Sequence, residues 1–393
     1  MATIKIGGAA LNQTPMDWDG NLAHILEAID QGRRTAIDML CLPELCITGY
    51  GCEDWFLSDW VSETAIAMLP AIASACKNIT VVVGLPIAFK GKMYNCCCII
   101  QNEEILGITA KQHMAIDGVH YEARWFSPWN ANVVDVIEID GIMYPFGDIV
   151  YRIEGYSVGF EICEDAWRAD TRPAHRLLEQ DVQIIMNPSA SHFALGKSIL
   201  RDNLVTSSSK KFNCVYVYAN LLGNEAGRMI YDGEILIAQK GKLIAKNNLL
   251  SFRDVNIVAA EVDVSEPFLS IGTKVLEDQG KDRDFTAAST LALFDYMRKS
   301  RSRGFVLSLS GGADSSCCAI LVAEMIKRGT EELGFELFLQ KLGRADLIAL
   351  VAAKDTSQNK RKFITGHILT TAYQATSNSS PETERSALEL AAS

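Results

Sequence analysis

The sequence predicts an α/β protein in two units, the first of which has two β-sheets covered by helices. Short apolar segments rich in β-branched residues alternate with segments whose apolar residues have helical spacing. Some of the apolar segments follow one another across short polar turns, as in hairpins. The chain has 393 residues, more than one ordinary hydrophobic core holds, which favours two domains.

The first element expected in the first half is a strand that begins at Ile4, close to the N-terminus. Apolar residues on one face, such as Leu22 and Ile29, predict the first helix, and Pro43 ends the second strand. In chain order we expect strand 4–11, helix 19–33, strand 38–43, helix 62–75, strand 81–86, and a hairpin of 94–101 with 104–109.

The β-prone segment Tyr156–Phe160 is the next expected strand, and the chain turns polar and helical after it. Gln239–Lys240–Gly241 has the composition of a hairpin turn. The further elements expected are strand 182–186, helix 197–212, an extended segment 214–219, a hairpin of 234–238 with 242–245, and strand 256–264.

Residues 265–284 mix proline, glycine and charge, so we expect a linker between a domain at 1–264 and a domain at 285–393. In the second domain we expect an amphipathic helix over 288–300 and a buried strand over 304–309. A loop at 310–316 then leads into an apolar helix that runs to about Lys327.

Composition excludes several classes of protein. The chain is 48% hydrophobic and 22% charged, as in globular domains, and its net charge of −11 argues against a nucleic-acid or anionic-membrane binder. No run approaches the roughly 20 apolar residues of a membrane helix. With no signal peptide before Ile4, we expect a cytoplasmic protein.

Eleven cysteines and six histidines form no Cys-x-x-Cys or His-x-x-x-His pair, which argues against a structural zinc site. We expect no prosthetic group. Cys96–Cys98 and Cys317–Cys318 stand among apolar residues, so we expect small core side chains in a reducing compartment.

Three reactive side chains, Glu44, Lys111 and Cys163, each follow the end of an expected strand. Such ends gather at one edge in layered α/β folds, where active sites form. A carboxylate, an ammonium and a thiol would supply a base, an oxyanion stabiliser and a nucleophile. Taken singly, each has an ordinary alternative as a surface charge or a core cysteine.

Several segments together resemble the nitrilase, or carbon–nitrogen hydrolase, superfamily. They are Pro43–Glu44–Leu45 with Thr48–Gly49–Tyr50, Tyr94–Asn95, Lys111, Glu122 and Ile162–Cys163–Glu164–Asp165. The resemblance covers about residues 3–263. It implies an α-β-β-α sandwich and a Glu44–Lys111–Cys163 triad, with Glu122 as an auxiliary carboxylate.

Residues Ser310–Gly311–Gly312–Ala313–Asp314–Ser315 lie between an expected strand and an expected helix. Small residues there let the backbone and the helix N-terminus approach a pyrophosphate, and no Walker A lysine follows. The motif resembles the pyrophosphate loop of the ATP pyrophosphatases, which implies a Rossmann-like α/β domain. The resemblance implies ATP binding by Ser308, Ser310, Gly311, Gly312, Ala313, Asp314, Ser315 and Ser316, and Mg²⁺ held with ATP by Asp314.

The order of a nitrilase-like glutaminase followed by such a domain resembles that of the glutamine-dependent NAD synthetases. Four segments also resemble that family, namely residues 123–129, 294–300, 307–315 and 373–380. This implies glutamine, ATP with Mg²⁺, and nicotinate adenine dinucleotide as substrates, with glutamine contacts at Ser191 and Lys197. In that reaction, ammonia from glutamine converts an adenylated dinucleotide into NAD, AMP and pyrophosphate. We also expect a homo-oligomer.

The synthetase domain of that family extends well beyond the position of Ser393, so we expect a C-terminally truncated chain. Such a chain would not make NAD alone, and from about Gly329 onward it would be poorly ordered or would depart from the family fold. Two alternatives stay open. One is a nitrilase-family amidase with a vestigial synthetase tail, and the other is a non-catalytic assembly subunit.

Overall fold

The computed structural model describes residues 3–225, 227–264, 280–375 and 380–393. The chain divides into two compact units, Met1–Asp278 and Gln279–Ser393. Most of the expected linker, residues 265–279, lies outside the described residues. Among the described helices, none combines the length and apolar character that crossing a membrane requires.

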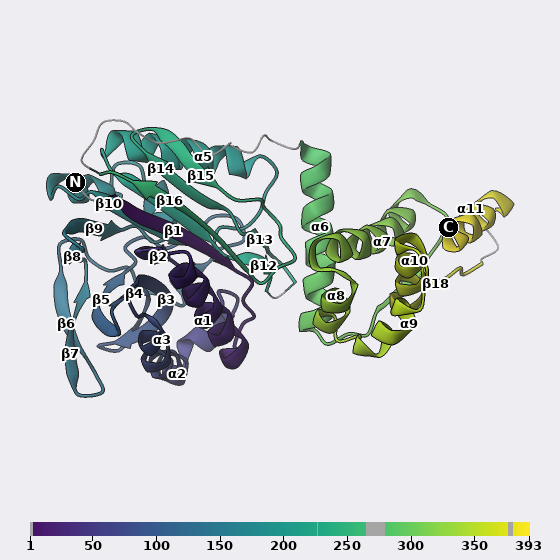
Figure 1. The fold of residues 1–393 in the computed structure, drawn as a ribbon, viewed down its shortest axis with the longest axis horizontal. Helices are drawn as coiled ribbons and strands as arrows, with labels where there is room; N and C mark the ends of the chain where they lie inside the picture. The colour runs from purple at the N-terminus through teal and green to yellow at the C-terminus, as the bar shows by residue number, and fades with distance from the viewer. Residues whose placement is uncertain (1–2, 226, 265–279, 376–379) are drawn as a thin grey trace. The chain divides into compact units, whose positions relative to one another are not determined.

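The first unit contains two large mixed sheets (Figure 1). The eight-stranded sheet has the order β16 (Val255–Val262), β1 (Ile4–Leu11), β2 (Met39–Cys41), β3 (Thr80–Phe89), β4 (Lys92–Gln101), β5 (Glu104–Ala110), β7 (Ile142–Gly147), β6 (Val134–Ile139). The six-stranded sheet has the order β15 (Lys242–Lys246), β14 (Ile235–Gln239), β11 (Val215–Asn220), β10 (Ile184–Ser189), β9 (Tyr156–Phe160), β8 (Tyr151–Ile153). The short strands β12 (Leu222–Asn224) and β13 (Ile230–Asp232) pair separately.

Helices cover the outer faces of both sheets. Buried residues of α1 (Trp18–Arg34), α2 (Asp59–Ala67) and α3 (Leu69–Ala75) pack on the larger sheet, and those of α4 (Ala174–Glu179) and α5 (Lys197–Lys211) on the smaller. A third apolar cluster, which includes Ile6, Val82, Phe160 and Met186, fills the space between the sheets. The predicted α-β-β-α sandwich is therefore confirmed.

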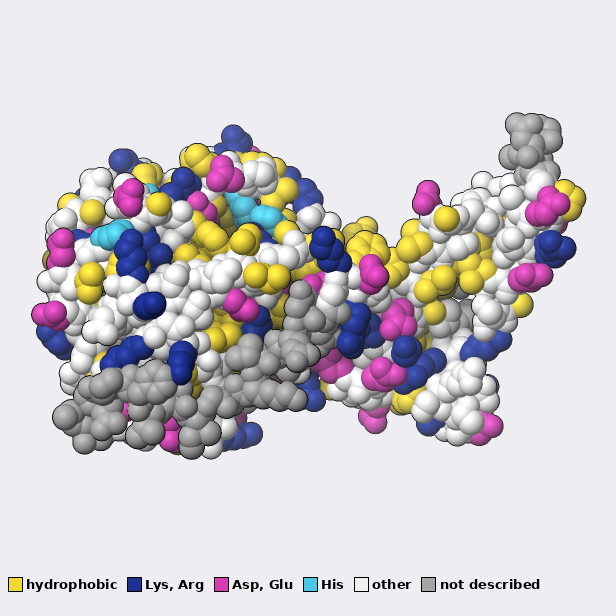
Figure 2. All heavy atoms as spheres, turned by 90° about the horizontal axis from the view of Figure 1, so that it is seen from above, with side chains coloured by type: hydrophobic (Ala, Val, Ile, Leu, Met, Phe, Trp, Pro, Cys, Tyr) yellow, Lys and Arg dark blue, Asp and Glu magenta, His cyan; other side chains and the backbone are white. Residues whose placement is uncertain are grey.

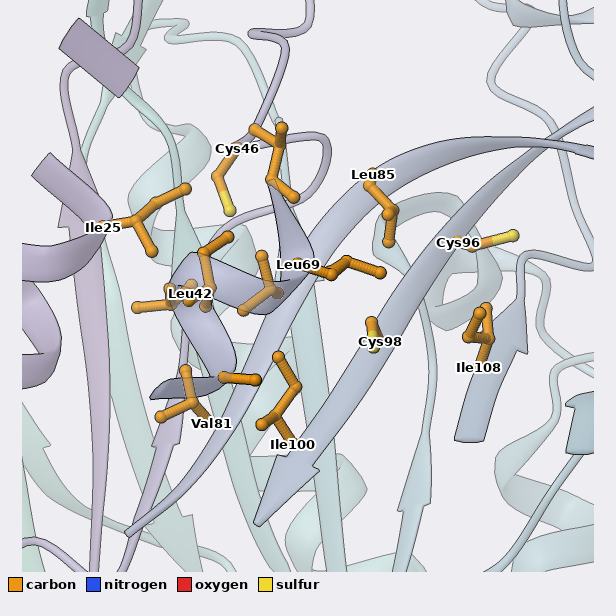
Figure 3. Packing of buried hydrophobic residues seen from close by; sticks show 14 of the residues in the cluster. Ile25, Leu42, Cys46, Leu69, Val81, Leu85, Cys96, Cys98, Ile100 and Ile108 are labelled. Atoms are coloured by element: carbon orange, nitrogen blue, oxygen red, sulfur yellow. The ribbon is translucent and has the colours of Figure 1, made fainter. Parts of the chain in front are cut away.

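Strand β4 shows how the alternation of a strand serves two cores at once. Cys96, Cys98 and Ile100 belong to the cluster beneath the helices (Figure 3), whereas Cys97 and Ile99 belong to the cluster between the sheets. Because successive side chains point to opposite faces, a continuous apolar run is the pattern of a strand covered on both sides. Cys96–Cys98 are thus small core residues, as predicted.

The helix expected over 62–75 is wrong as a single element. The structure has α2 and α3 instead, with a break at Met68 and with Pro70 in the first turn of α3. Proline has no backbone N–H and clashes with the preceding turn, but it fits the first turn of a new helix. The turn residue Met68 therefore separates two short helices.

The second unit has a parallel pair of strands, β17 (Phe305–Ser308) and β18 (Leu369–Ala372), among helices. The helices are α6 (Lys281–Lys299), α7 (Ala313–Leu333), α8 (Phe335–Lys341), α9 (Ile348–Ala352), α10 (Ser357–Ile368) and α11 (Pro381–Ala392). Helix α6 begins inside the expected linker, seven residues before the expected helix start. A cluster around Leu309, Ala319 and Ala387 joins α7 to α11.

Two burial predictions for the second unit are wrong. Strand β17 alternates between half-buried and exposed residues, and Val306 is 83% exposed, because β18 is its one paired neighbour among the described strands. Cys317 and Cys318 are exposed near the start of α7 rather than in a core. Hydrophobic side chains are accordingly visible on the surface of this unit in Figure 2.

Candidate active site

The four residues predicted for the reaction centre come together from four separate elements. Glu44 lies just after β2, Lys111 just after β5, and Glu122 at the start of the 3-10 helix Glu122–Arg124. Cys163 opens the 3-10 helix Cys163–Trp167 after β9. All four side chains are buried. Glu44 and Lys111 follow strands of the eight-stranded sheet and Cys163 follows a strand of the six-stranded sheet, so the cluster gathers strand ends of both sheets rather than one sheet edge.

Lys111 is the centre of this cluster. Its Nζ donates to Glu44 Oε1 at 2.6 Å and to Glu122 Oε1 and Oε2 at 2.8 and 2.7 Å. Burial opposes the ammonium charge, but the Glu122 and Glu44 carboxylates outweigh it and raise the pKa of Lys111. Lys111 therefore stays charged between two carboxyl groups.

Glu44 has one bound and one free oxygen. Oε1 accepts from Lys111 and from Asn95 Nδ2, at 2.7 Å from the amide. Oε2 is buried and has no hydrogen-bond partner among the described residues. Burial raises the pKa of Glu44, Lys111 opposes that shift, and the neighbouring Glu122 carboxylate adds to it. Glu44 thus has an oxygen available for a proton and an environment that favours taking it.

Gly84 of β3 allows Glu44 to occupy this position. A Cβ added at Gly84 would lie 2.3 Å from the backbone nitrogen of Leu45 and 2.6 Å from the carbonyl oxygen of Pro43. The backbone that carries Glu44 therefore packs directly on β3, at a distance that only glycine permits. Leu45 itself has a φ of 49°, so the chain turns sharply right after Glu44.

Cys163 occupies a strained backbone position. Its φ is 46°, in the left-handed region, which costs a non-glycine residue about 1–3 kcal/mol. Burial raises the pKa of the thiol, and the Glu44 and Glu122 carboxylates add to that more than Lys111 takes away. The resting side chain is therefore a thiol rather than a thiolate, and it needs a base to become a nucleophile.

Asp165 joins the Cys163 turn to the chain that follows Lys111. One carboxylate oxygen accepts from the backbone N–H groups of Gln112 and His113, at 3.1 and 2.7 Å. The other oxygen accepts from the Ile162 N–H at 2.9 Å. Two of these bonds cross to the segment after Lys111 and the third holds Asp165 within the Cys163 turn, so Asp165 fixes the nucleophile and the lysine relative to each other.

The two predicted glutamine contacts lie on a neighbouring loop and helix. The backbone of Ala190, just before Ser191, hydrogen-bonds the Cys163 thiol. Arg201 Nη2 donates to Ser191 Oγ at 3.2 Å, and Asn220 Oδ1 accepts from the Ser191 N–H at 2.7 Å. Lys197 is half-buried, and burial lowers its pKa to about 8.

Other residues of the site were not predicted. Tyr50 Oη donates to Glu122 Oε1 at 2.5 Å, and the Glu225 carboxylate accepts from the backbone N–H groups of Tyr50 and Gly51. Tyr50 and Asn95 stand in the segments that carry the family resemblance, which is a usable sequence signal. Glu225 has no such signal, since 175 residues separate it from Tyr50.

The predicted pyrophosphate loop joins β17 to α7 and is held by its own serines. Ser315 Oγ accepts from the Ser310 N–H at 3.2 Å and donates to the Gly312 carbonyl at 3.1 Å. Gly311 has a φ of 79°, which glycine adopts without strain. The predicted ATP-binding residues Ser308, Ser310, Gly312, Ala313 and Asp314 are exposed, and Gly311, Ser315 and Ser316 are half-buried. Among the described residues no group of three His, Cys, Asp or Glu side chains could hold a metal ion, so Asp314 could contact one only alongside other ligands.

Comparison with known proteins agrees with this geometry. The carbon–nitrogen hydrolase family matches residues 5–266. The chain is 30% identical to the glutamine-dependent NAD(+) synthetase of Bos taurus, over 99% of this chain and 61% of the relative. It is 29% identical to that of Rattus norvegicus, over 99% of this chain and 59% of the relative. The chain thus spans about 60% of the length of the curated relatives it matches.

Solved structures extend the likeness to both units. A glutamine-dependent NAD(+) synthetase from Cytophaga hutchinsonii is 51% identical, with a TM-score of 0.90 over 100% of this chain and 63% of that one. Our expectation that residues from about Gly329 onward depart from the family fold is therefore wrong. An amidase from Nesterenkonia sp., 17% identical, shares the fold with a TM-score of 0.53 over 66% of this chain and 90% of that one. From the match over residues 5–266, the chain belongs to the carbon–nitrogen hydrolase family.

Proposed function

We propose that the first unit hydrolyses glutamine through a thioester on Cys163 and supplies ammonia for NAD synthesis. The observation that carries this proposal is the free oxygen of Glu44, buried in the same cluster as a protonated cysteine and a charged lysine. A thiol, a poised carboxylate and a fixed cation are the groups that amide cleavage by a cysteine requires.

In the first half of the reaction, Cys163 Sγ attacks the side-chain amide carbon of glutamine while Glu44 Oε2 takes the thiol proton. Lys111 and the backbone N–H of Glu164 stabilise the oxyanion of the tetrahedral intermediate. Glu44 then gives its proton to the departing nitrogen, the C–N bond breaks, and ammonia leaves a thioester behind. Water, activated by Glu44, hydrolyses the thioester to glutamate and restores the thiol.

Glutamine is oriented by Ser191 and Lys197. The Ser191 loop is held from beneath by Arg201 and Asn220, so it presents a fixed surface beside Cys163. Lys197 offers an ammonium to the α-carboxylate of the substrate. Glu122 anchors Lys111 rather than acting as the base, because its two oxygens already accept from Lys111, Tyr50 and the Ala115 N–H.

The second unit binds the phosphates of ATP, with Mg²⁺ as part of the substrate, and takes part in adenylating nicotinate adenine dinucleotide. Support comes from the exposed loop Ser310–Ser316 at the N-terminus of the 21-residue helix α7, where free N–H groups attract anions. A structural neighbour, the glutamine-dependent NAD+ synthetase of Acinetobacter baumannii, was solved in complex with adenosine diphosphate.

The deciding experiment is Cys163→Ala, assayed by glutamate release from glutamine alongside thermal unfolding. We expect hydrolysis to fall by at least about 10³-fold, because the covalent route is lost, and the unfolding temperature to change little. Hydrolysis above a tenth of the wild-type rate would refute the proposal. Adding ATP, Mg²⁺ and the dinucleotide, with and without ammonia, tests the expectation that this chain alone makes no NAD, and formation of NAD and AMP would contradict it. Native mass measurement tests the expected homo-oligomer.

A further inference from the structure

Two histidines, His120 and His192, connect the reaction centre to Lys197. Tyr50 Oη, already bonded to Glu122, lies 3.2 Å from His120 Nδ1. His120 Nε2 lies 2.8 Å from His192 Nδ1, and the rings are 4.9 Å apart between centroids. Lys197 Nζ lies 3.4 Å from the same nitrogen of His192. The contacts form one unbranched path of half-buried and buried groups from Glu122 to Lys197.

The position of the hydrogen on each side chain of this path is determined by the side chain to which it is hydrogen-bonded. Glu122 also accepts from Lys111 and Ala115, so it is a carboxylate that can only accept, and the phenol proton of Tyr50 points at it. Burial and the Glu122 charge raise the pKa of Tyr50 and keep that proton in place. Tyr50 Oη can then only accept from His120, so His120 Nδ1 carries the hydrogen.

A neutral imidazole has one N–H, so a hydrogen on His120 Nδ1 leaves His120 Nε2 bare. At 2.8 Å, the bare nitrogen must accept from His192, whose hydrogen therefore also lies on Nδ1. If His192 carried its hydrogen on Nε2 instead, two bare nitrogens would meet and no hydrogen bond would form. The direction of donation is thus the same along the whole path, from His192 towards Glu122.

We propose that His120 and His192 are positioning residues, held as neutral Nδ1–H tautomers in one directed chain of hydrogen bonds that runs from His192, beside Lys197, to Glu122. At one end the Tyr50 hydroxyl donates to Glu122, which anchors Lys111 and leaves Glu44 as the base. At the other end His192 Nδ1 already bears a hydrogen, so Lys197 cannot donate to it. The protons of Lys197 stay free for the carboxylate of glutamine.

The charges around the pair also favour the neutral rings. Burial lowers the pKa of His120 to about 4, with Lys197 and Lys111 acting in the same direction and with Glu122 and Asp117 opposing. Burial likewise lowers the pKa of His192 to about 4, with Lys197, His120 and Arg201 contributing and Asp232 opposing. Both imidazoles are therefore uncharged over the whole range in which Lys197 titrates.

The tautomers can be measured directly by ¹H–¹⁵N correlation of ¹⁵N-histidine-labelled protein, since the chain has six histidines. Spectra of His120→Asn and His192→Asn assign the two rings. We expect both to show a protonated Nδ1 and a bare Nε2 from pH 8 down to pH 6. A hydrogen on Nε2 of either ring, or a charged ring at pH 7, would overturn the inference. This readout does not need glutamine hydrolysis, so it stands apart from the proposed function on which the positioning role rests.

Measurements of activity then test what the chain of hydrogen bonds contributes to the reaction. In His192→Leu, His120 Nε2 loses its donor, and we expect kcat/KM for glutamine to fall about tenfold, while Tyr50 still holds the His120 hydrogen on Nδ1. In His192→Asn, an amide N–H near the position of Nδ1 should donate to His120 Nε2 and restore most of the rate. His367→Asn, in α10 of the second unit, is the control. Equal losses in the Leu and Asn variants, with equal loss of thermal stability, would reduce the pair to simple packing and refute the positioning role.

Discussion

The two predicted sites of this chain are built in opposite ways. The Glu44–Lys111–Cys163 cluster lies inside a four-layer sandwich, where Lys111 is fully buried and Glu44 is held by Asn95 and Lys111, both distant in sequence. The pyrophosphate loop is exposed and is held within itself, by bonds between residues two to five positions apart. The comparison teaches that a covalent site needs a dry, fixed scaffold, whereas a phosphate site needs accessible backbone N–H groups.

The largest expected effect comes from Glu44→Gln, which removes the base while preserving the shape of the buried site. Glutamine turnover should fall about 10²–10⁴-fold, the usual worth of a general base. Stability should hold, because Lys111 keeps Glu122 as its partner. Glutamate release and thermal unfolding on the same sample provide the measurement. Normal turnover would exclude Glu44 as the base and make Glu122 the candidate.

Gly84→Ala tests whether the buried site depends on the close packing of β3 against the Glu44 backbone. The added methyl group would lie 2.3 Å from Leu45 N, so the backbone must move. We expect a stability loss of about 1–3 kcal/mol and a fall in glutamine turnover of roughly 10²-fold, because catalysis tolerates little displacement. Gly366→Ala, where the methyl group meets open space in α10, is the matched control. Unchanged turnover in Gly84→Ala would show that the site adapts more than the geometry suggests.

Gly311→Ala makes the corresponding change in the exposed loop. Its φ is 79° and a Cβ would lie 2.1 Å from the Thr383 carbonyl oxygen, so the loop or α11 must shift. We expect ATP binding, followed by calorimetry with Mg²⁺ present, to weaken about tenfold, while glutamine hydrolysis stays within about twofold. Gly312→Ala is the control, since its Cβ would be 3.4 Å from Ser310 Oγ, an ordinary contact. Equal effects of the two substitutions would argue against a loop shaped by Gly311.

The smallest expected effect is a pH dependence of glutamine binding. Burial lowers the pKa of Lys197 to about 8, so the ammonium that binds the carboxylate is lost as the pH rises through 8. KM should therefore rise several-fold between pH 7 and pH 9, apart from any change in kcat. Lys197→Arg keeps the cation at these pH values and should remove the rise. A flat KM in the wild type would remove Lys197 from the glutamine site.

Much of the sandwich could be predicted because its strands are buried on both faces and read as apolar runs. The hairpin β6–β7 was not predicted, since Val134, Val136 and Ile142 are exposed and the strands lack the clean alternation of a half-buried sheet. The burial of β17 was predicted wrongly for a related reason. An apolar sequence shows that a strand can be buried, but it does not show whether neighbouring strands are present to cover it.

The site divides in the same way. Glu44, Lys111 and Cys163 follow strand ends, and strand ends can be read from the sequence. Glu225 and the His120–His192 pair take their roles from distances across the fold, and the two histidines are 72 positions apart in the sequence. A single sequence gives no measure of such distances, so only the positions carried by the family resemblance could be anticipated.

The distribution of the cysteines has a consequence for oxidation. Nine of the eleven are buried, and Cys317 and Cys318 alone are exposed. Peroxide and other oxidants react with accessible sulfur, so the first oxidative lesion should fall near the start of α7 rather than on Cys163. The proposed thioester site is thus protected from oxidants, and the proposed phosphate loop is exposed to them. Under the proposed function, an oxidised preparation would keep glutamine hydrolysis while its ATP binding weakens.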